Sequence, residues 1–336
     1  MAGVTIIAEI GQAHDGSLGI LHSYIDALAA TGVDVVKFQT HIAEAESSHL
    51  EPFRVKFSLE DKTRFDYWKR MSFTAEQWRE IKAHCEEVGL EFMSSPFSMA
   101  AVELLESIDV KRYKIGSGEV SNKLMLERIA QTGKPIILSS GMSSLEELQS
   151  SVDFLAPFGN DLTVLQCTTS YPTQPENVGL NVLNDLAELF PQATIGLSDH
   201  SGTIYPAIAA VALGAKVLEF HTVFDKRMFG PDASSSLTID EVAGLVKGVR
   251  YIEKALENPI DKSDNSPYTE LKGIFEKSLA VNKDLPAGHV LSKEDLEAKK
   301  PGGAGISAGD FEAVVGKKLV SAKAQYDFIQ SNDLTE

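Results

Sequence analysis

The chain has 336 residues, of which 43% are hydrophobic and 24% are charged, and its formal net charge is −17. This balance is typical of a folded protein with one large core and room for a small extra domain, and it argues against disorder. Nucleic acids and anionic membranes bind clustered basic surfaces, so the acidic charge argues against both as partners.

Cysteine content and hydropathy indicate the compartment. Cys85 and Cys167 are too few for a disulfide framework or a thiolate metal cluster, which fits a reducing environment. The first residues enter a strand-like run without a leader pattern, and no stretch reaches ~18 uninterrupted apolar residues. We therefore expect a cytoplasmic protein without a membrane span.

Eight short runs rich in β-branched and apolar residues follow one another along the chain. They cover residues 4–10, 33–39, 90–95, 112–117, 135–140, 162–168, 193–198 and 215–221. Stretches with helical periodicity lie between them, at residues 18–32, 74–89, 100–108, 124–133, 144–159, 182–190 and 205–214, and a last one covers 239–257.

Near-continuously apolar strands joined by helices predict a parallel sheet whose outer face is covered. Eight such units in about 250 residues match a closed (β/α)8 barrel, the TIM barrel. A doubly wound sheet is the alternative, but it normally has fewer strands and a glycine-rich first turn, which this sequence lacks.

The sequence changes character after residue 257. Residues 258–273 are polar, contain turn formers and lack periodicity, so we interpret them as a linker. Residues 274–336 contain short strand-like pieces interrupted by proline and glycine, which predicts a small β-rich domain. We therefore expect a barrel domain over residues 1–257, the linker, and a second domain over residues 274–336.

The predicted strands end in polar residues, on the side of the barrel where the βα loops gather and active sites lie. These residues are Glu9, Lys37, Gln39, Ser94, Ser95, Lys114, Ser117, Ser139, Ser140, Thr168, Thr169, Ser198, Asp199, His200, Glu219 and His221. One polar residue at a strand end needs no functional explanation. Two lysines, two glutamates and two histidines at one mouth indicate a functional site.

The two histidines end neighbouring strands, so their imidazoles can face each other across roughly 5 Å of strand spacing. Either His200 or His221 could be a hydrogen-bonded structural residue, but the pair favours one shared divalent metal. The mouth offers no thiolate and no third imidazole. We therefore expect a hard ion that keeps several waters, Mn²⁺ or Mg²⁺, rather than a structural zinc.

Lys37 and Lys114 lie within apolar strands, where a surface position does not fit. Together with the Ser/Gly loops at 114–119 and 138–142, their two ammonium groups indicate a cradle for a phosphate or a carboxylate. Either lysine could instead form the Schiff base of an aldolase. We expect Glu219 to pair with a lysine or another charged group rather than to bind metal.

Two further residues follow the strands. Asp232 could accept hydrogen bonds from the hydroxyl groups of a polyol, or it could form an Asx turn after Pro231. Tyr171 precedes Pro172 and should be extended, with its ring either packed in the core or forming a wall of the site.

Ten segments together resemble the sialic acid synthase family, whose members make nonulosonic acids. They are IAEIGQAHDG, VVKFQTH, FMSSPFS, YKIGSGE, KPIILSSGM, CTTSYPT, IGLSDHS, ALGAKVLEFH, GPD and KKPGGAGI. The match spans nearly the whole chain and keeps the order and spacing of the motifs.

The resemblance implies a TIM barrel with a C-terminal SAF (antifreeze-like) domain that covers the barrel mouth of its partner in a domain-swapped homodimer. It also implies a synthase that condenses phosphoenolpyruvate with an N-acylated mannosamine-type aldehyde and releases phosphate. The product would be N-acetylneuraminate or, from a diacetamido-trideoxyhexose, legionaminic or pseudaminic acid. A non-catalytic sugar- or phosphate-binding barrel is the alternative of another class.

The resemblance also implies roles for individual residues. Phosphoenolpyruvate would be bound by Lys37, Lys114, Ser117, Ser139 and Ser198. His200 and His221 would hold the metal, and Glu9 would handle protons or a water on the metal. The remaining substrate-binding residues would be Gln39, Thr169, Tyr171, Asp232 and Lys300.

Three positions depart from the family pattern. Thr169 stands where Asn or Ser is usual, which would alter one hydrogen bond to phosphoenolpyruvate. Phe220 replaces a Lys or Arg just before His221, which we expect to remove a positive charge from the site. Lys300 replaces an Arg that reads the acyl amide of the sugar, and lysine lacks the planar fork of arginine.

Overall fold

The structure is a computed structural model that describes residues 3–55 and 57–336. Its contacts divide the chain into two compact units, Met1–Asn258 and Pro259–Glu336. Within the described part of the first unit, eight parallel strands close a barrel, which confirms the predicted fold class. No helix among the described residues combines the length and the hydropathy needed to cross a membrane.

The barrel strands coincide with the eight predicted runs, apart from small differences at their ends. They are β1 (Thr5–Glu9), β2 (Val35–Thr40), β3 (Glu91–Pro96), β4 (Tyr113–Ile115), β5 (Ile136–Ser139), β6 (Leu162–Cys167), β7 (Thr194–Asp199) and β8 (Val217–Val223). Each pairs in parallel with the next, and β8 pairs with β1 to close the ring. A short strand, β9 (Leu237–Thr238), pairs in parallel with the end of β8.

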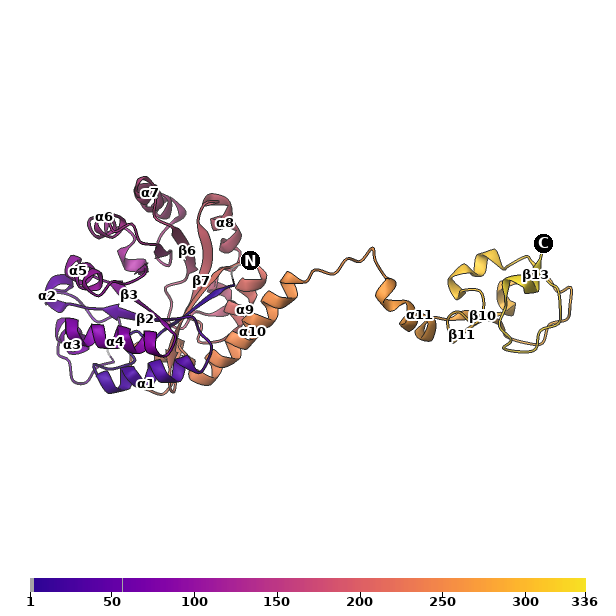
Figure 1. Ribbon diagram of the computed structural model, residues 1–336, viewed down its shortest axis with the longest axis horizontal. Coiled ribbons are helices and arrows are strands. Elements are labelled where there is room, and N and C mark those ends of the chain that lie inside the picture. Colours follow the sequence, from indigo (N-terminus) through magenta and orange to yellow (C-terminus); the bar gives the residue numbers. More distant parts are fainter. Residues whose placement is uncertain (1–2, 56) are drawn as a thin grey trace. The chain divides into compact units, whose positions relative to one another are not determined.

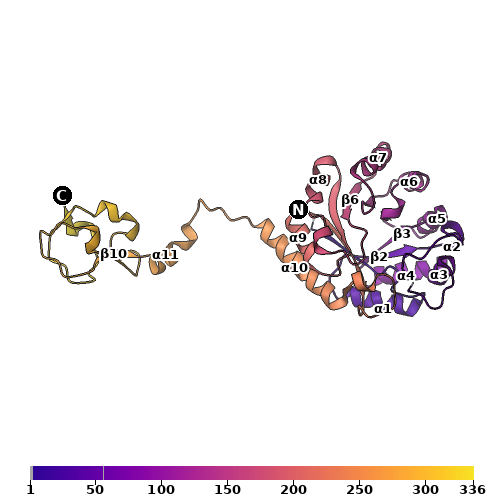
Figure 2. The ribbon, with the colours of Figure 1, turned by 180° about the vertical axis from the view of Figure 1, so that it is seen from behind.

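Helices surround the strands of this unit, as Figure 1 shows from one side and Figure 2 from behind. They are α1 (Leu18–Ala29), α2 (Ala43–Glu46), α3 (Arg64–Met71), α4 (Ala75–Glu87), α5 (Met99–Ser107), α6 (Lys123–Ala130), α7 (Leu145–Leu155), α8 (Val182–Leu189), α9 (Tyr205–Ala212) and α10 (Ile239–Glu257). Helices α2 and α3 were not predicted. They are short, and α3 buries only Tyr67, Trp68 and Met71, too few residues for a clear periodic signal.

The barrel interior is layered, because alternate residues of each strand point to the same face. The lower layer is apolar and consists of Ile7, Val35, Met93, Ile137, Leu165 and Val217. Two positions further along the same strands stand six buried residues that line the mouth, namely Glu9, Lys37, Ser95, Ser139, Cys167 and Glu219. The interior therefore changes from apolar to polar within one period of the strands.

Strand β7 has Gly196 at the position of the lower layer. A Cβ atom on Gly196 would lie 2.6 Å from Leu165 Cδ2 and closer still to the carbonyl oxygen of Val217. Glycine is therefore required here, because it leaves the space that the side chains of the two neighbouring strands fill.

The second unit is small and antiparallel. Strands β10 (Ser278–Val281) and β11 (Leu296–Lys299) form one pair, and β12 (Lys318–Leu319) and β13 (Leu334–Thr335) form another. Its core consists of Leu279, Val281, Leu285, Leu291, Val314, Leu319 and Ile329.

One helix of this unit, α11 (Thr269–Phe275), lies partly in the segment interpreted as a linker. It buries no residue and spans only seven positions, so it has no apolar stripe for a periodicity argument to find.

Candidate active site

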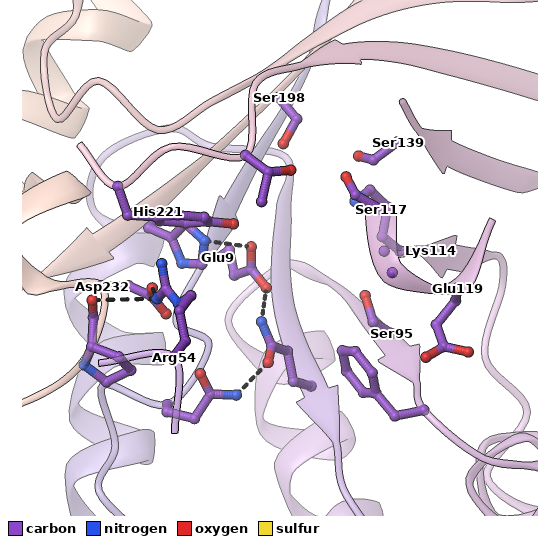
Figure 3. Close-up of a pocket in the computed structure, with 18 of the residues that line it drawn as sticks. Glu9, Arg54, Ser95, Lys114, Ser117, Glu119, Ser139, Ser198, His221 and Asp232 are labelled. Atoms are coloured by element: carbon purple, nitrogen blue, oxygen red, sulfur yellow. Dashed lines mark hydrogen bonds and ion pairs between the residues drawn. The ribbon is translucent and has the colours of Figure 1, made fainter. Parts of the chain in front are cut away.

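A cavity of about 420 Å³ lies at the carboxyl ends of the barrel strands. Figure 3 shows His221, Glu9, Arg54 and Asp232 on one side of it and Lys114, Ser117, Ser139 and Glu119 on the other. Among its lining residues are Glu9, Lys37, Gln39, Lys114, Ser117, Ser139, Thr169, Tyr171, Ser198, His200, His221 and Asp232. The structure thus brings together all predicted site residues of the barrel. Lys300 belongs to the second unit, so its position at the mouth of a barrel stays a prediction.

Two lysines and two glutamates form ion pairs on the floor of the cavity. Lys37 Nζ lies 2.5 Å from Glu9 Oε1 and 3.7 Å from Glu219 Oε1, and Lys114 Nζ lies 2.9 Å from Glu219 Oε1. All four side chains are at most 4% exposed. The predicted pairing of Glu219 with a lysine is confirmed. An unpaired charge at this depth would be very costly, so the pairing explains why charged residues occur in buried strands.

The ion pairs set the protonation of the carboxyl groups. Burial alone would raise the pKa of Glu9, but His221, Lys37 and Lys114 outweigh it, and the pKa is lowered. Burial would also raise the pKa of Glu219, and here the two lysines outweigh it and lower the pKa. Both carboxylates are therefore ionised at neutral pH.

The same contacts bear on the aldolase alternative. Burial by itself would lower the pKa of Lys37, but Glu219 and Glu9 outweigh it and raise the pKa. A Schiff-base lysine must be neutral to attack a carbonyl carbon. A lysine held protonated between two carboxylates is unsuited to that role.

His200 and His221 face each other as the sequence predicted, with 5.3 Å between ring centroids. His200 Nδ1 lies 3.0 Å from the carbonyl oxygen of Thr168, which can only accept, so Nδ1 carries a proton and Nε2 is the nitrogen that can offer a lone pair to a metal. His221 Nε2 lies 3.3 Å from Glu9 Oε2. A ring nitrogen that donates to a backbone carbonyl is the usual support of a metal-binding histidine, so His200 fits that role.

Across residues 3–55 and 57–336, no group of three or more His, Cys, Asp or Glu side chains is arranged to hold a metal. An ion between His200 and His221 would therefore complete its coordination with water or substrate oxygens. That donor set suits Mn²⁺ or Mg²⁺ better than a closed zinc site.

Hydroxyl groups line the opposite side of the floor. Ser117 Oγ accepts from the backbone N–H of Gly141 at 3.1 Å, and Ser198 Oγ donates to Glu219 Oε1 at 3.1 Å. Within the described part of the chain, Ser139 Oγ and Glu219 Oε2 are buried without a hydrogen-bond partner. Unpaired polar atoms beside two ammonium groups indicate a place where a ligand or water completes the hydrogen bonding.

The upper wall of the cavity joins three loops. The ring of Tyr171 stacks on His200, with 4.2 Å between centroids, so Tyr171 forms a wall of the site. Asp232 Oδ1 accepts from Arg54 Nη2 at 2.6 Å. The guanidinium carbon of Arg54 lies 4.1 Å from the centroid of the Tyr171 ring. One arginine therefore contacts both residues predicted to bind the sugar.

Sequence reasoning missed several residues of this lining. They are Gln12, His41, Glu46, Glu51, Arg54, Arg64, Trp68, Phe97, Glu119, Met142 and Cys167. Glu119 and Cys167 stand at the ends of predicted strands, and that signal could have found them. The expectation of a mouth without a thiol and without a third imidazole was therefore wrong, because Cys167 and His41 line the cavity. Arg54 and Arg64 come from the long connection between β2 and α4, where no periodic pattern marks an inward face.

The expectation for Phe220 was wrong. Phe220 alternates with Glu219 and His221, and it is buried in the core between the strands and the helices. A cation at this position would point away from the mouth, so the change to phenylalanine removes no charge from the site.

Comparison with known proteins followed the same division of the chain. A sequence model described as the NeuB family matches residues 24–261, and a model of the SAF domain matches residues 276–334. The human N-acetylneuraminate-9-phosphate synthase is 37% identical, with 96% of this chain and 90% of the relative covered. An N,N'-diacetyllegionaminic acid synthase of Campylobacter jejuni is 35% identical, with 94% and 96% covered.

A solved structure extends the comparison to the fold. The N-acetylneuraminic acid (sialic acid) synthetase of Leptospira borgpetersenii, in complex with citrate, superposes with a TM-score of 0.71 at 29% sequence identity. The match covers 81% of this chain and 91% of that chain.

Proposed function

This chain belongs to the NeuB family of phosphoenolpyruvate-dependent nonulosonic acid synthases, and from that premise we propose that it condenses phosphoenolpyruvate with an N-acylated mannosamine-type aldose. The product would be a sialic-type acid, with phosphate as the second product. A diacetamido-trideoxyhexose is the second candidate acceptor, because an N,N'-diacetyllegionaminic acid synthase is similar over nearly the whole chain.

The observation that carries the proposal is the division of the cavity into two ends. At the floor, the unpaired Ser139 Oγ lies on the side of Lys114 and Ser117, a setting for the anionic substrate. At the rim, Tyr171 and Asp232 offer an aromatic wall and a hydrogen-bond acceptor, a setting for a sugar. The histidine pair contacts both ends, because His221 lies beside Glu9 at the floor and His200 stacks on Tyr171 at the rim.

Phosphoenolpyruvate is assigned to the floor. Its phosphate would contact Lys37 and Lys114, together with the hydroxyl groups of Ser117, Ser139 and Ser198. Each ammonium group has three donors, so a lysine can bind a substrate oxygen while it keeps its carboxylate partner. Before the substrate binds, Lys37 and Lys114 are thus already in position, and their positive charges are balanced by Glu9 and Glu219.

The acceptor is assigned to the rim. Tyr171, Asp232 and Gln39 would contact the aldose, whereas Thr169 would contact phosphoenolpyruvate. Lys300 of the partner subunit would complete the site in a domain-swapped dimer. In this assignment, the aldehyde carbon would lie between the histidine pair and the enol carbon of phosphoenolpyruvate.

His200 and His221 would hold the divalent ion, Mn²⁺ or Mg²⁺. When bound, the ion supplies Lewis-acid polarisation of the aldehyde oxygen. The protein's own part is to present two nitrogen lone pairs from a rigid barrel. The Thr168 carbonyl fixes the tautomer of His200 for this purpose.

In the reaction, the enol carbon of phosphoenolpyruvate attacks the aldehyde carbon, and positive charge develops at C2 of phosphoenolpyruvate. Water adds at C2 to give a tetrahedral adduct, whose bond from C2 to the phosphate oxygen breaks as the new hydroxyl group becomes the ketone. Of the two protons that the water loses, one would go to the former aldehyde oxygen, which becomes a hydroxyl group, and one to the departing phosphate. Glu9, which is ionised, would orient this water and accept its proton. Lys37 and Lys114 would stabilise the charge that grows on the departing phosphate, a preorganised electrostatic contribution.

A panel of aldoses tests the proposal. Each aldose is incubated with phosphoenolpyruvate and Mn²⁺, and both released phosphate and product mass are measured. We expect phosphate release to depend on an N-acylated mannosamine-type aldose and to match the product in amount. Binding of phosphoenolpyruvate without phosphate release from any aldose would instead support the non-catalytic barrel.

A further inference from the structure

The side-chain amide of Gln39, near the end of β2, has a fixed orientation. Gln39 Nε2 lies 2.7 Å from Glu9 Oε1, a contact that a dashed line marks in Figure 3. The ionised carboxylate of Glu9 can only accept, so Gln39 turns its Nε2 toward Glu9 and its Oε1 the other way. Oε1 there accepts a hydrogen bond from Gln12 Nε2. Gln39 thus connects the carboxylate of Glu9 to a second group of polar side chains.

His41 continues this chain of hydrogen bonds. Its Nε2 lies 3.0 Å from Gln12 Nε2 and 3.1 Å from Gln39 Oε1. Its Nδ1 lies 2.6 Å from Glu46 Oε1, a carboxylate oxygen that accepts, so Nδ1 carries a proton. Through Nε2, a neutral ring accepts from Gln12 and a charged ring donates to Gln39. His41 therefore contacts the two glutamines in either state.

Aromatic packing fixes the plane of the His41 ring. Its centroid lies 3.7 Å from that of Trp68 and 4.4 Å from that of Phe97, and both pairs are stacked. The side chain of His41 is 3% exposed and that of Glu46 is 6% exposed. A polar pair at this depth would be costly to break, so it holds one arrangement.

The carboxylate of this pair comes from a helix that contributes little to the apolar core. Glu46 ends α2, which has four residues and buries only Ala43. Glu46 Oε2 also accepts from the backbone N–H of Ile42 at 3.3 Å, a second contact that orients the carboxylate. The packing of an apolar helix face therefore does not explain why Glu46 lies against His41.

The contacts of Glu9 show what the chain of hydrogen bonds can control. Lys37 and Gln39 both bind Glu9 Oε1, and Oε2 is the oxygen that lies 3.3 Å from His221 Nε2. Two donors on one oxygen fix the rotation of a carboxylate better than a single flexible lysine does. The amide of Gln39 therefore sets the direction in which Oε2 points.

We propose that His41 and Glu46 form a positioning pair, which acts through the two glutamines to hold the carboxylate of Glu9 toward the water that adds to phosphoenolpyruvate. The inference rests on the proposed function, in which Glu9 orients that water. Neither member of the pair needs to contact a substrate for this role, because the effect passes through Gln39.

The first test is His41→Phe, which keeps a flat ring beside Trp68 and Phe97 and removes both ring nitrogens. Phosphate release is measured with phosphoenolpyruvate, Mn²⁺ and the N-acylated aldose that the unaltered protein converts fastest. We expect kcat to fall roughly 10- to 100-fold, as is usual when a residue that orients a reactive group is lost. The KM for phosphoenolpyruvate should stay within about threefold of its original value.

A double-mutant cycle shows whether His41 acts through Gln39. In a Gln39→Met background the hydrogen bond to Glu9 is already lost, so adding His41→Phe should lower kcat by no more than about twofold. Effects of the two substitutions that multiply would show that His41 acts independently of Gln39, and they would overturn the inference.

Two further positions test the chain without altering the stacked rings. Glu46→Gln keeps an oxygen that can accept from His41 Nδ1 and should retain kcat within about threefold, whereas Glu46→Leu should lower kcat as much as His41→Phe does. Gln12→Met removes the amide between His41 and Gln39 and should also match His41→Phe. Equal losses in Glu46→Gln and Glu46→Leu would contradict the proposed role of the hydrogen bond.

His84→Phe is the matched control, because His84 Nε2 contacts Asp26 Oδ1 at 3.0 Å between α4 and α1, away from the cavity. It should change kcat by less than about twofold. A melting temperature for each variant identifies folding defects, and Gln12→Met decides the question if His41→Phe does not fold.

The outcomes separate this inference from the proposed function. If the unaltered protein forms no product from any aldose, the proposed function fails and the positioning role fails with it. If the unaltered protein forms product and a folded His41→Phe keeps its full kcat, only the positioning role is overturned.

Discussion

Glu9 and His221 show how strand register brings buried polar residues of neighbouring strands together at the floor of the cavity. The Cα atom of Glu9 is paired in register with Lys37 on one side and with His221 on the other. The carboxylate therefore contacts Lys37 from one neighbouring strand and His221 from the other, and it stays ionised despite its burial. Removing Glu9 or Lys37 would leave a buried charge without its partner, so these two residues depend on each other for stability as well as for activity.

At the same scale, His221 tests the metal assignment. A chelator should abolish phosphate release, and Mn²⁺ or Mg²⁺ should restore it. His221→Ala should lose both turnover and Mn²⁺ binding, measured by calorimetry, while its far-UV circular dichroism spectrum stays unchanged. Turnover that survives chelation would refute the metal role, and a variant that unfolds would indicate a structural histidine.

His14 predicts a pH dependence of stability. Burial, with smaller contributions from His41 and Arg70, lowers the pKa of His14 from 6.5 to about 3. Below pH 6.5 the unfolded chain binds a proton that the folded chain refuses until about pH 3. The free energy of unfolding should therefore fall with decreasing pH in this window, by at most about 1.4 kcal/mol per pH unit from this group.

The measurement is urea unfolding at several pH values. His14→Gln cannot take up a proton, so its free energy of unfolding should depend less on pH than that of the unaltered protein. His49→Gln, at an exposed histidine, serves as the control. Parallel pH profiles for the unaltered protein and His14→Gln would contradict the prediction.

At the scale of the elements, the closure of the barrel rests on complementary sizes in the lower layer. Leu165 of β6 and Val217 of β8 occupy the space that Gly196 leaves between them. The strands on either side of β7 therefore pack through a position without a side chain. A change of one methyl group at this position affects three neighbouring strands at once.

Gly196→Ala should be destabilising by at least about 3 kcal/mol, because the new methyl group overlaps the backbone of β8. Gly244→Ala is the matched control, since Gly244 is exposed in α10 with nothing within 4 Å of an added Cβ. That change should stabilise the protein by about 0.5–1 kcal/mol through helix propensity. The free energy of unfolding of both variants is measured by chemical unfolding. Similar changes in this free energy from the two alanine substitutions would refute the packing argument.

At the scale of the whole molecule, one chain contains two folded units. The SAF domain could act on the barrel of its own chain or, in a domain-swapped dimer, on the barrel of the partner subunit. The sequence resemblance implies the second case. In that case Lys300 would serve the barrel of the other subunit, and the complete site would contain residues of both subunits.

Mixed dimers test this prediction. His221→Ala inactivates the barrel, and Lys300→Ala impairs the SAF domain, so each homodimer should be weak. Coexpressed with distinguishable tags, the two variants should form heterodimers in which one intact barrel meets one intact SAF domain. We expect purified heterodimers to recover about half of the original activity, since one of two sites is complete. Heterodimers no more active than the homodimers would place Lys300 in its own barrel's site.

The sequence by itself determined the fold and most of the candidate site. Strand alternation is a local, two-residue period, so an apolar run that ends in polar residues already shows where the interior of the barrel becomes its mouth. The histidine pair, the lysines and Ser139 follow from this period, because their own strands position them. The type of reaction was predicted from the resemblance of the motifs to the sialic acid synthase family.

Only the tertiary structure decided which charges pair and which distant residues complete the rim. The pairing of Glu219 with Lys114 depends on two strands meeting across the barrel interior. Phe220 is a different case, because its local alternation with Glu219 and His221 already turns it away from the mouth. Arg54 lies in an irregular connection and Arg64 begins the short helix α3, so no clear period marks either residue, and their side chains are positioned by packing against Tyr171, Asp232 and Trp68. Contacts that depend on long-range packing produce no periodic pattern in the local sequence.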